Sequence, residues 1–314
     1  MKTETKQYDL IIMGAGPAAY TAAIYAKRYG IDTLIIGEAL GGLAADAHKI
    51  CNFPSKPDVS GMDLMRDMLQ QVQDMDVPVV MDTVIGIENK HKEEFVVSTM
   101  NKKEFRAKNI LLTIGTKRTH LGLDREQEFL GRGVSYCATC DAMFYRNKTA
   151  IVVGGGNSAH TASLHLAEVA KKVYQIYRGP KLKGEPAWID QVEKNDKVEV
   201  LYNTNVIELL GDEVLEGVCI DKERNGKDTI NTDGLFIEIG SQPDKIFSER
   251  LGLRVDAKGH INVDVAQKTS VSGVWAAGDI TTASNGFRQI ITACSEGAIA
   301  AESIFQDLQK TKNG

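Results

Sequence analysis

The chain has 314 residues, of which 43% are hydrophobic and 25% are charged, and its 37 basic and 42 acidic side chains leave a net charge of −5. This length suits roughly two domains of about 150 residues each. The composition is that of a folded globular protein, which excludes a disordered chain, a collagen and a disulfide scaffold. The charge argues against nucleic acid or an anionic membrane as the main partner, because both bind clustered Lys and Arg.

The beginning of the chain predicts a cytoplasmic protein. Residues 1–7 are polar and lack the apolar core of a signal peptide, and the first apolar run meets Gly14, Gly16 and Pro17 well before it reaches a membrane-spanning length. The five cysteines form no disulfide-framework pattern, as expected in a reducing compartment.

Two segments, residues 9–28 and 149–168, resemble each other at a constant offset of 140 residues. Each starts with an apolar run of strand length and ends in an Ala-rich stretch of helix length. A second strand is expected after each helix, at residues 32–36 and 172–176. Between strand and helix lies Gly-x-Gly-x-x-Ala, formed by Gly14, Gly16 and Ala19 in the first segment and by Gly154, Gly156 and Ala159 in the second.

This repeat predicts two βαβ units that bind dinucleotides. The glycines permit a tight turn, close approach of the backbone to a pyrophosphate and close packing of helix on strand. Either motif alone could be a plain tight turn, but two in register favour an α/β protein with two Rossmann-like, three-layer ββα domains.

The residue after each second strand distinguishes the two units chemically. Glu38 corresponds to Arg178 at the same offset. A carboxylate at this position binds both ribose hydroxyls and suits FAD or NAD, whereas an arginine favours the 2′-phosphate of NADP. The alternative for Arg178 is a solvated surface charge.

The remaining segments indicate that the second unit is inserted in the first. Residues 110–116 and 234–241 are predicted as apolar strands that end in Ile-Gly and lead from one domain to the other. Short antiparallel strands are expected between residues 78 and 107 and between residues 198 and 233, with turns at 88–93 and 223–228.

Towards the end of the chain, residues 274–279 form an apolar strand that ends in Gly-Asp, and an Ala-rich helix is expected over residues 289–308. In flavoproteins with two nucleotide units, such an aspartate binds the ribityl or phosphate region of FAD. The alternative for Asp279 is an ordinary cap of the following helix.

Cys137 and Cys140 form a C-x-x-C pair just before the second unit, and Asp141 follows directly. A buried inert pair, or a zinc site completed by His48 and Cys51, would also use these cysteines, but no metal site is expected. The pattern favours a redox-active dithiol, in which one thiolate attacks a disulfide and the second resolves the mixed disulfide. Asp141 is then a candidate general acid, with a pKa raised by desolvation.

Taken together, the chain resembles the low-molecular-weight thioredoxin reductases, which are FAD-dependent pyridine nucleotide-disulfide oxidoreductases, over essentially its whole length. The motifs that carry the resemblance are Gly14-Ala-Gly-Pro-Ala-Ala19, Gly41-Gly42, Asn52-Phe-Pro54, Cys137-Ala-Thr-Cys-Asp141, Gly154-Gly-Gly-Asn-Ser-Ala159, Ala277-Gly-Asp279 and Arg288-Gln289.

The resemblance implies an FAD-binding domain formed by residues 1–117 and 246–314, and an NAD(P)-binding-like domain at residues 118–245 that carries the dithiol. It implies a homodimer, and thioredoxin or a similar small disulfide protein as the partner. Cys140 is expected nearest the flavin, Cys137 exchanges with the partner's disulfide, and Asp141 is the acid.

The same resemblance implies the cofactor-binding residues. Those expected to bind FAD are Gly14, Gly16, Pro17, Ala18, Glu38, Gly42, Asn52, Gly115, Asp279, Arg288 and Gln289. Those expected to bind NADPH are Gly154, Gly156, Asn157, Ser158, Ala159, Arg178 and Lys183.

Two departures from the family pattern affect these expectations. Leu43 and Ala44 follow the Gly41-Gly42 pair, where the family usually has a glutamine. In the run from Tyr177 to Lys183, one arginine and two lysines stand where the family has His-Arg-Arg and a further arginine, and lysine lacks the bidentate fork of arginine.

Four hypotheses therefore remain open. The first is an NADPH-dependent thioredoxin reductase with an altered phosphate pocket. The second keeps the flavin and the dithiol but takes electrons from reduced ferredoxin, a deazaflavin or NADH. The third is a dithiol oxidase that passes electrons to oxygen, and the fourth is a non-catalytic flavoprotein that senses nucleotides or binds partners.

Overall fold

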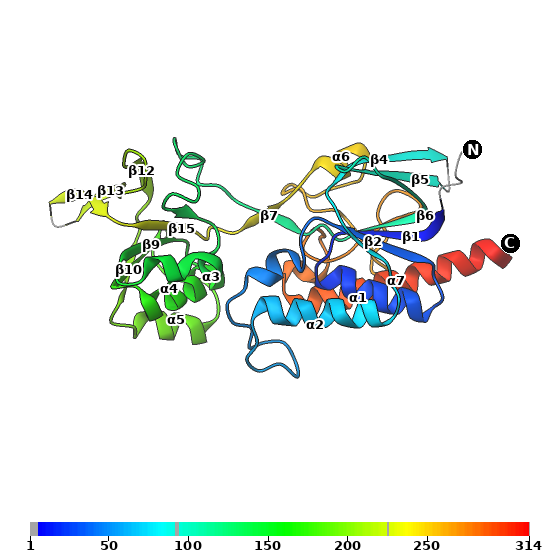
Figure 1. The fold of residues 1–314 in the computed structure, drawn as a ribbon, viewed down its shortest axis with the longest axis horizontal. Coiled ribbons are helices and arrows are strands. Elements are labelled where there is room, and N and C mark those ends of the chain that lie inside the picture. The colour runs from blue at the N-terminus through cyan, green and yellow to red at the C-terminus, as the bar shows by residue number, and fades with distance from the viewer. Residues whose placement is uncertain (1–5, 92–93, 225, 314) are drawn as a thin grey trace. The chain divides into compact units, whose positions relative to one another are not determined.

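A computed structural model of the chain describes residues 6–91, 94–224 and 226–313. The chain divides into two compact units: unit 1 comprises Met1–Lys117 and Gln242–Gly314, and unit 2 comprises Arg118–Ser241 (Figure 1). Unit 2 is therefore inserted in unit 1. The chain passes between the units at β7 (Thr116–Arg118) and β16 (Ser241–Pro243).

Unit 1 is built on a seven-stranded sheet in the order β3-β2-β1-β6-β5-β4, with β17 also paired to β6. The strands β3, β2, β1, β6 and β17 run parallel, whereas β4 and β5 form an antiparallel hairpin beside the first half of β6. The bounds are β1 (Gln7–Met13), β2 (Thr33–Gly37), β3 (Val79–Met81), β4 (Val84–His91), β5 (Glu94–Thr99), β6 (Glu104–Leu112) and β17 (Val274–Ala276).

The central strand β1 is apolar on both faces because both faces are covered. Leu10 and Ile12 pack into a core shared with helices α1, α2 and α7, whereas Ile11 and Met13 pack into a second core shared with β4, β5 and α6. Alternate residues of a strand point to opposite faces, so a doubly covered strand shows an unbroken apolar run. This arrangement is a three-layer ββα domain.

The helices α1, α2 and α7 lie together on one side of this sheet (Figure 1). Small side chains such as Ala18, Ala19 and Ala22 are buried along α1 and allow close helix packing. The helical bounds in unit 1 are α1 (Pro17–Arg28), η1 (Gly42–Asp46), α2 (Gly61–Asp74), α6 (Ile246–Arg250), η3 (Ser284–Gly286) and α7 (Ile290–Asn313).

Unit 2 has a five-stranded parallel sheet in the order β11-β10-β9-β15-β8 and a separate antiparallel sheet in the order β12-β13-β14. Its strands are β8 (Val134–Ser135), β9 (Thr149–Val153), β10 (Lys172–Tyr177), β11 (Val198–Tyr202), β12 (Val206–Leu210), β13 (Gly217–Arg224), β14 (Lys227–Asn231) and β15 (Gly234–Ile237). Its helices are α3 (Ala138–Asp141), η2 (Ala142–Tyr145), α4 (Asn157–Val169) and α5 (Pro186–Glu193).

The two predicted βαβ units are confirmed as β1-α1-β2 and β9-α4-β10. The predicted strands 110–116 and 234–241 were too long, because β6 ends at Leu112 and β15 at Ile237. Gly115 and Gly240 beyond these ends have positive φ angles of 61° and 100°, which extended strands do not adopt. The predicted helix 289–308 was too short, because α7 continues to Asn313.

The regions predicted as antiparallel also contain parallel strands. β3 pairs in parallel with β2, and β11 pairs in parallel with β10, so each extends the nucleotide-binding sheet. The predicted turn at 88–93 was placed too early, since β4 continues to His91; residues 92 and 93 lie outside the described residues.

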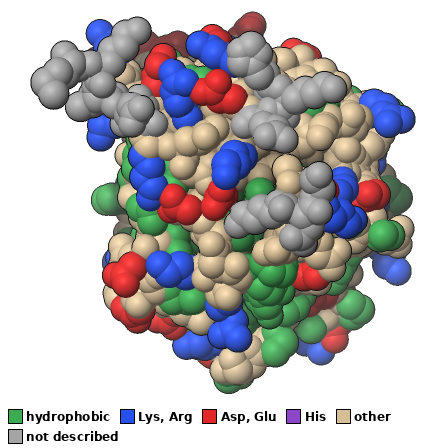
Figure 2. Space-filling view, turned by 90° about the vertical axis from the view of Figure 1, so that its right-hand side faces the viewer, with side chains coloured by type: hydrophobic (Ala, Val, Ile, Leu, Met, Phe, Trp, Pro, Cys, Tyr) green, Lys and Arg blue, Asp and Glu red, His purple; other side chains and the backbone are tan. Residues whose placement is uncertain are grey.

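On the face drawn in Figure 2, basic side chains (Lys, Arg) and acidic side chains (Asp, Glu) are interspersed, and neither kind forms a large patch. Among the described residues, no helix is long and apolar enough to cross a lipid bilayer.

Candidate active site

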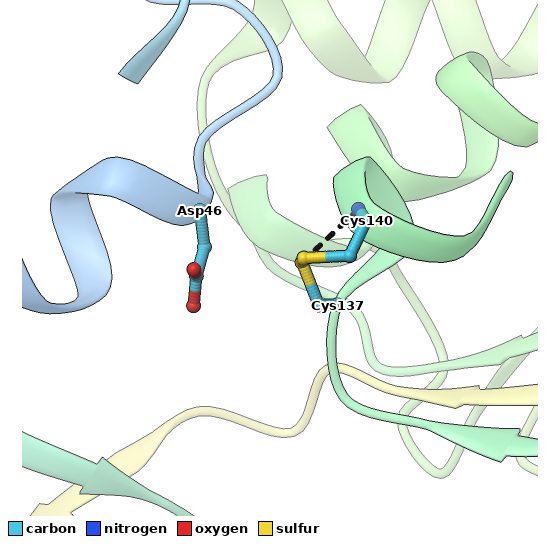
Figure 3. A group of neighbouring side chains, drawn as sticks. All are labelled: Asp46, Cys137 and Cys140. Atoms are coloured by element: carbon cyan, nitrogen blue, oxygen red, sulfur yellow. Dashed lines mark hydrogen bonds between the residues drawn. A yellow bond between two sulfur atoms is a disulfide. The ribbon is translucent and has the colours of Figure 1, made fainter. Parts of the chain in front are cut away.

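The cysteine pair lies at the start of a short helix in unit 2. The parallel strand β8 leads into Cys137, which caps α3, and Cys137 and Cys140 are joined by a disulfide (Figure 3). The backbone N–H of Cys140 donates to the Cys137 sulfur over 3.1 Å. A sulfur that accepts a backbone N–H is stabilised as a thiolate once the disulfide is reduced. The predicted pair is therefore in bonding contact, and the geometry favours Cys137 as the thiolate.

Ser135, which the sequence analysis missed, fixes the backbone of Cys137. Its hydroxyl accepts the N–H of Cys137 over 3.0 Å and lies 3.3 Å from the Cys137 carbonyl oxygen, to which it can donate. The side chain is buried, so these bonds are shielded from water. Ser135 thus orients the cysteine from the preceding strand.

Asp141 is half-buried one residue beyond Cys140, and its N–H donates to the Cys137 carbonyl oxygen over 3.2 Å. Burial, together with the negative charges of Asp141 and Asp233, raises the pKa of Tyr145 to about 12. Asp141 is the last residue of α3, the short helix that Cys137 caps and that contains Cys140.

Two apolar side chains next to the dithiol are exposed: Met143 is 58% exposed and Phe144 is 71% exposed. Large exposed side chains of this kind occur at protein interaction sites, where aromatic residues dominate the binding energy. Neither residue is among those predicted from the sequence. Their only signal was two large apolar residues in the polar neighbourhood of the C-x-x-C motif.

In unit 1, the predicted FAD residues gather at the carboxyl ends of the parallel strands, where ligands of such sheets bind. Gly14 follows β1 with a φ of 126°, and a Cβ there would lie 2.3 Å from the Thr113 carbonyl oxygen beyond β6. Glu38 follows β2 and Gly115 follows β6, while Gly42 begins η1. The Gly41 N–H donates to the Ala15 carbonyl oxygen over 2.7 Å, which joins this second glycine pair to the first turn.

The start of helix α1 fits a pyrophosphate. Gly16 is its N-cap and offers no side chain to cap the helix, Pro17 occupies the first turn, and that turn contains no acidic residue. No side chain at the N-cap therefore accepts the backbone N–H groups of the first turn, such as that of Ala18. A dinucleotide phosphate is the group that such a turn accommodates.

The loops around this turn bring distant residues together. The side-chain amide of Asn52 donates to the side-chain carbonyl oxygen of Gln289 over 3.0 Å, although the two residues are 237 positions apart in the sequence. The Arg288 Nε donates to the Asp279 backbone oxygen over 3.2 Å. Burial raises the pKa of Asp279, and the Arg288 guanidinium opposes part of this rise. An aspartate held away from water here is suited to hydroxyl groups of a bound ligand.

In unit 2, a second glycine turn joins β9 to α4. Gly154 has a φ of 150°, and a Cβ there would lie 2.1 Å from the Glu238 carbonyl oxygen. Gly156 is the N-cap of α4 and, like Gly16, provides no capping side chain. Asn157 and Ser158 open the helix, whereas Ala159 is buried beneath it. This turn also fits a pyrophosphate.

The cations predicted for the 2′-phosphate lie on the loop after β10. The N–H of Lys183 donates to the Gly155 carbonyl oxygen over 2.7 Å, which holds the loop against the glycine turn. Arg178, Lys181 and Lys183 are exposed, and none of the three forms an ion pair within the part of the chain that the structure describes. These three cations suit a phosphate group, but only Arg178 among them can bind it with the bidentate fork of a guanidinium. Asn157 instead exchanges hydrogen bonds of 2.8 and 3.0 Å with Glu185.

Comparison with known proteins agrees with this arrangement. Residues 8–297 match the family model described as pyridine nucleotide-disulphide oxidoreductase. A thioredoxin reductase of Peptoclostridium acidaminophilum is 35% identical over 304 residues, which cover 94% of this chain and 95% of that protein.

Two solved structures are also similar. The Lactococcus lactis thioredoxin reductase in the FR conformation has a TM-score of 0.91 and 31% identity over 96% of this chain and 99% of that one. A ferredoxin-flavin thioredoxin reductase of Clostridium acetobutylicum has a TM-score of 0.54 and 30% identity over 98% of this chain and 100% of that one.

Proposed function

The chain belongs to the pyridine nucleotide-disulphide oxidoreductase family, and from this premise we propose that it is a thioredoxin reductase-like flavoenzyme. It passes electrons from NADPH through FAD and the Cys137–Cys140 pair to a protein disulfide such as that of thioredoxin. The observation that carries the proposal is the closed Cys137–Cys140 disulfide, with Asp141 beside it, in a unit that also contains a glycine turn for a dinucleotide.

FAD, when bound, supplies two electrons from the pyridine nucleotide to the disulfide. The residues that would hold it are those at the carboxyl edge of the unit 1 sheet, from Gly14 and Glu38 to Asp279 and Gln289. Arg178 and Lys183 would bind the 2′-phosphate of NADPH at the second glycine turn.

The reduced cysteine pair then exchanges with the substrate. The Cys137 thiolate attacks the substrate disulfide, so that one mixed disulfide forms and one substrate thiolate leaves. The Cys140 thiol loses its proton and attacks the Cys137 sulfur, which restores the Cys137–Cys140 bond and releases the second substrate thiolate. Asp141 donates a proton to the first substrate thiolate and then takes the proton that Cys140 loses, so it ends protonated as it began. Two electrons and one proton pass from the cysteine pair to the substrate, and the second substrate thiolate takes its proton from solvent.

The exposed Met143 and Phe144 support a protein rather than a small molecule as the acceptor. A relative named thioredoxin reductase supports thioredoxin as that protein. The enzyme would act as a cytoplasmic homodimer, and equilibrium sedimentation of the holoenzyme tests the dimer.

The deciding experiment is an anaerobic titration of the purified flavoprotein with NADPH, followed by bleaching of the visible flavin band. We expect stoichiometric bleaching and subsequent reduction of thioredoxin. No bleaching by NADPH, in a protein that dithionite does bleach, would reject NADPH as the donor.

A second candidate uses the same flavin and dithiol with another donor. It is favoured by the loop after β10, where Gly179 and Pro180 follow Arg178, and by the similarity to a ferredoxin-flavin thioredoxin reductase. Bleaching by reduced ferredoxin, a deazaflavin or NADH, but not by NADPH, would support it. Peroxide formation from small dithiols and oxygen, without thioredoxin reduction, would instead indicate a dithiol oxidase.

A further inference from the structure

Glu296 in helix α7 is a buried acid, 4% exposed, whose side chain accepts three hydrogen bonds. The donors are the N–H of Gly278 over 2.8 Å, the hydroxyl of Thr281 over 2.9 Å and the hydroxyl of Ser284 over 2.6 Å. A buried carboxyl group is stable only when its oxygens have such donors. All three donors lie in one stretch of chain, residues 278–284, between β17 and α7.

This stretch contains Asp279, one of the residues expected to bind FAD. Gly278 directly before it has a φ of 83°, a left-handed conformation that favours glycine. The Glu296 side chain therefore holds the turn at its first residue, near its middle at Thr281 and at its far end at Ser284. Asp279 lies between the first two of these points.

The neighbouring Gly297 connects the same helix to the pyrophosphate turn. A Cβ at Gly297 would lie 2.2 Å from the Ala18 carbonyl oxygen, so α7 packs directly on the first turn of α1. A Cβ at Gly278 would lie 3.2 Å from the Ala18 Cβ. The Asp279 turn, the start of α1 and this part of α7 consequently form one packed group within unit 1.

We infer that Glu296 is a positioning residue for FAD. Its side chain fixes residues 278–284 so that Asp279 and the start of α1 are arranged together for the ribityl and pyrophosphate groups before the cofactor binds. The inference rests on the proposed function, because it assumes that this site of unit 1 holds FAD. It assigns Glu296 no contact with FAD.

An alternative explanation is that Glu296 affects FAD binding through its negative charge rather than through the hydrogen bonds that hold the turn. Burial raises the pKa of Asp279, Arg288 opposes the rise, and the negative charge of Glu296 adds to it. Glutamine at position 296 separates the two effects. Its amide oxygen can accept from Gly278 and Thr281, and its NH₂ group can donate to the Ser284 hydroxyl, so the turn keeps three bonds without the charge.

The test is the dissociation constant of FAD for the apoprotein, from quenching of flavin fluorescence, together with the urea unfolding midpoint of each apoprotein. We expect Glu296→Ala to weaken FAD binding at least about tenfold, which corresponds to roughly 1.4 kcal/mol. Glu296→Gln should stay within about threefold of wild type, a difference below 1 kcal/mol. Glu302→Ala, which removes an acid from the same helix, is the matched control and should leave the affinity unchanged.

Ser284→Ala provides a second variant, because Ser284 is exposed and its loss leaves the core intact. We expect it to weaken FAD binding about threefold and to lower the unfolding midpoint only slightly, because Glu296 keeps its bonds to Gly278 and Thr281. This variant is the decisive one if Glu296→Ala does not fold. Wild-type affinity in Glu296→Ala or in Ser284→Ala, or an equal loss in Glu296→Gln and Glu296→Ala, would overturn the inference. If the wild-type apoprotein does not bind FAD, the proposed function fails together with the inference.

Discussion

Tyr136, the residue directly before Cys137, donates a hydrogen bond from its hydroxyl to the buried carboxylate of Glu126. The same carboxylate accepts the backbone N–H groups of Leu121, Gly122 and Leu123 over 3.2, 2.7 and 3.2 Å. Burial raises the pKa of Glu126, but these hydrogen bonds outweigh it and hold the pKa below its usual value. The segment that leads to the dithiol is thus fastened to the preceding loop.

We expect Tyr136→Phe to lower the free energy of unfolding at pH 7 by about 1.5–3 kcal/mol, the usual contribution of a hydrogen bond to a charged group. Because the folded pKa of Glu126 is depressed, its contribution is present above the unfolded pKa of about 4.3 and is lost as pH falls through the folded pKa. The variant raises that folded pKa towards the unfolded value, so it starts less stable at pH 7 and loses less further stability than wild type as the pH falls.

Urea unfolding followed by circular dichroism between pH 3 and pH 7 measures both effects on the stability. Tyr25→Phe, which removes a hydroxyl from an exposed tyrosine, is the control and should leave the curves unchanged. A Tyr136→Phe variant with the pH profile of wild type would show that this hydrogen bond does not contribute to folding.

Cys140→Ser should trap a covalent complex with thioredoxin. Without the second sulfur, the mixed disulfide on Cys137 is not resolved, so the reduced variant incubated with oxidised thioredoxin gives one stable adduct. Non-reducing electrophoresis and intact mass measure it. Cys137→Ser should form little adduct, and Cys51→Ser, which removes an exposed cysteine elsewhere, should turn over normally. More adduct in Cys137→Ser than in Cys140→Ser would reverse the two roles.

The two nucleotide units were predictable because their signal is local. An unbroken apolar strand such as residues 10–13 of β1, followed by glycines that need positive φ or close packing, specifies a βαβ turn within some twenty residues. Strand ends were less predictable. Ile114 and Ile239 read as strand residues, but the backbone turns at Gly115 and Gly240 depend on the neighbouring chain.

The candidate site was only partly predictable. Asn52 and Gln289 share a hydrogen bond across 237 residues of sequence, and no spacing rule connects them; they were expected at the flavin through family resemblance alone. Ser135 and Glu296 went unnoticed because a buried serine or glutamate has no distinguishing pattern until its hydrogen-bond partners are known.

Arg178→Ala should weaken NADPH much more than NADH. Arg178 is exposed without an ion pair among the described residues, and its guanidinium is the only one on the loop after β10. Under the proposed function it would form a charge-assisted bond to the 2′-phosphate, which NADH lacks. A loss of about 1.5–3 kcal/mol corresponds to roughly 10–150-fold in the dissociation constant for NADPH. Titration with both nucleotides measures it, and Lys222→Ala on β13 is the control. Equal losses for the two nucleotides would exclude a phosphate contact.

Phe144→Ala should impair the reaction with a protein disulfide but not with a small one. Phe144 is 71% exposed beside the dithiol, and truncation of an exposed aromatic anchor in an interface costs more than about 1 kcal/mol. We expect KM for thioredoxin to rise about fivefold or more, with an unchanged rate towards a small aromatic disulfide. Val265→Ala, at a 95% exposed site in unit 1, is the control. If both substrates are affected equally, Phe144 acts on the dithiol itself and the docking role is wrong.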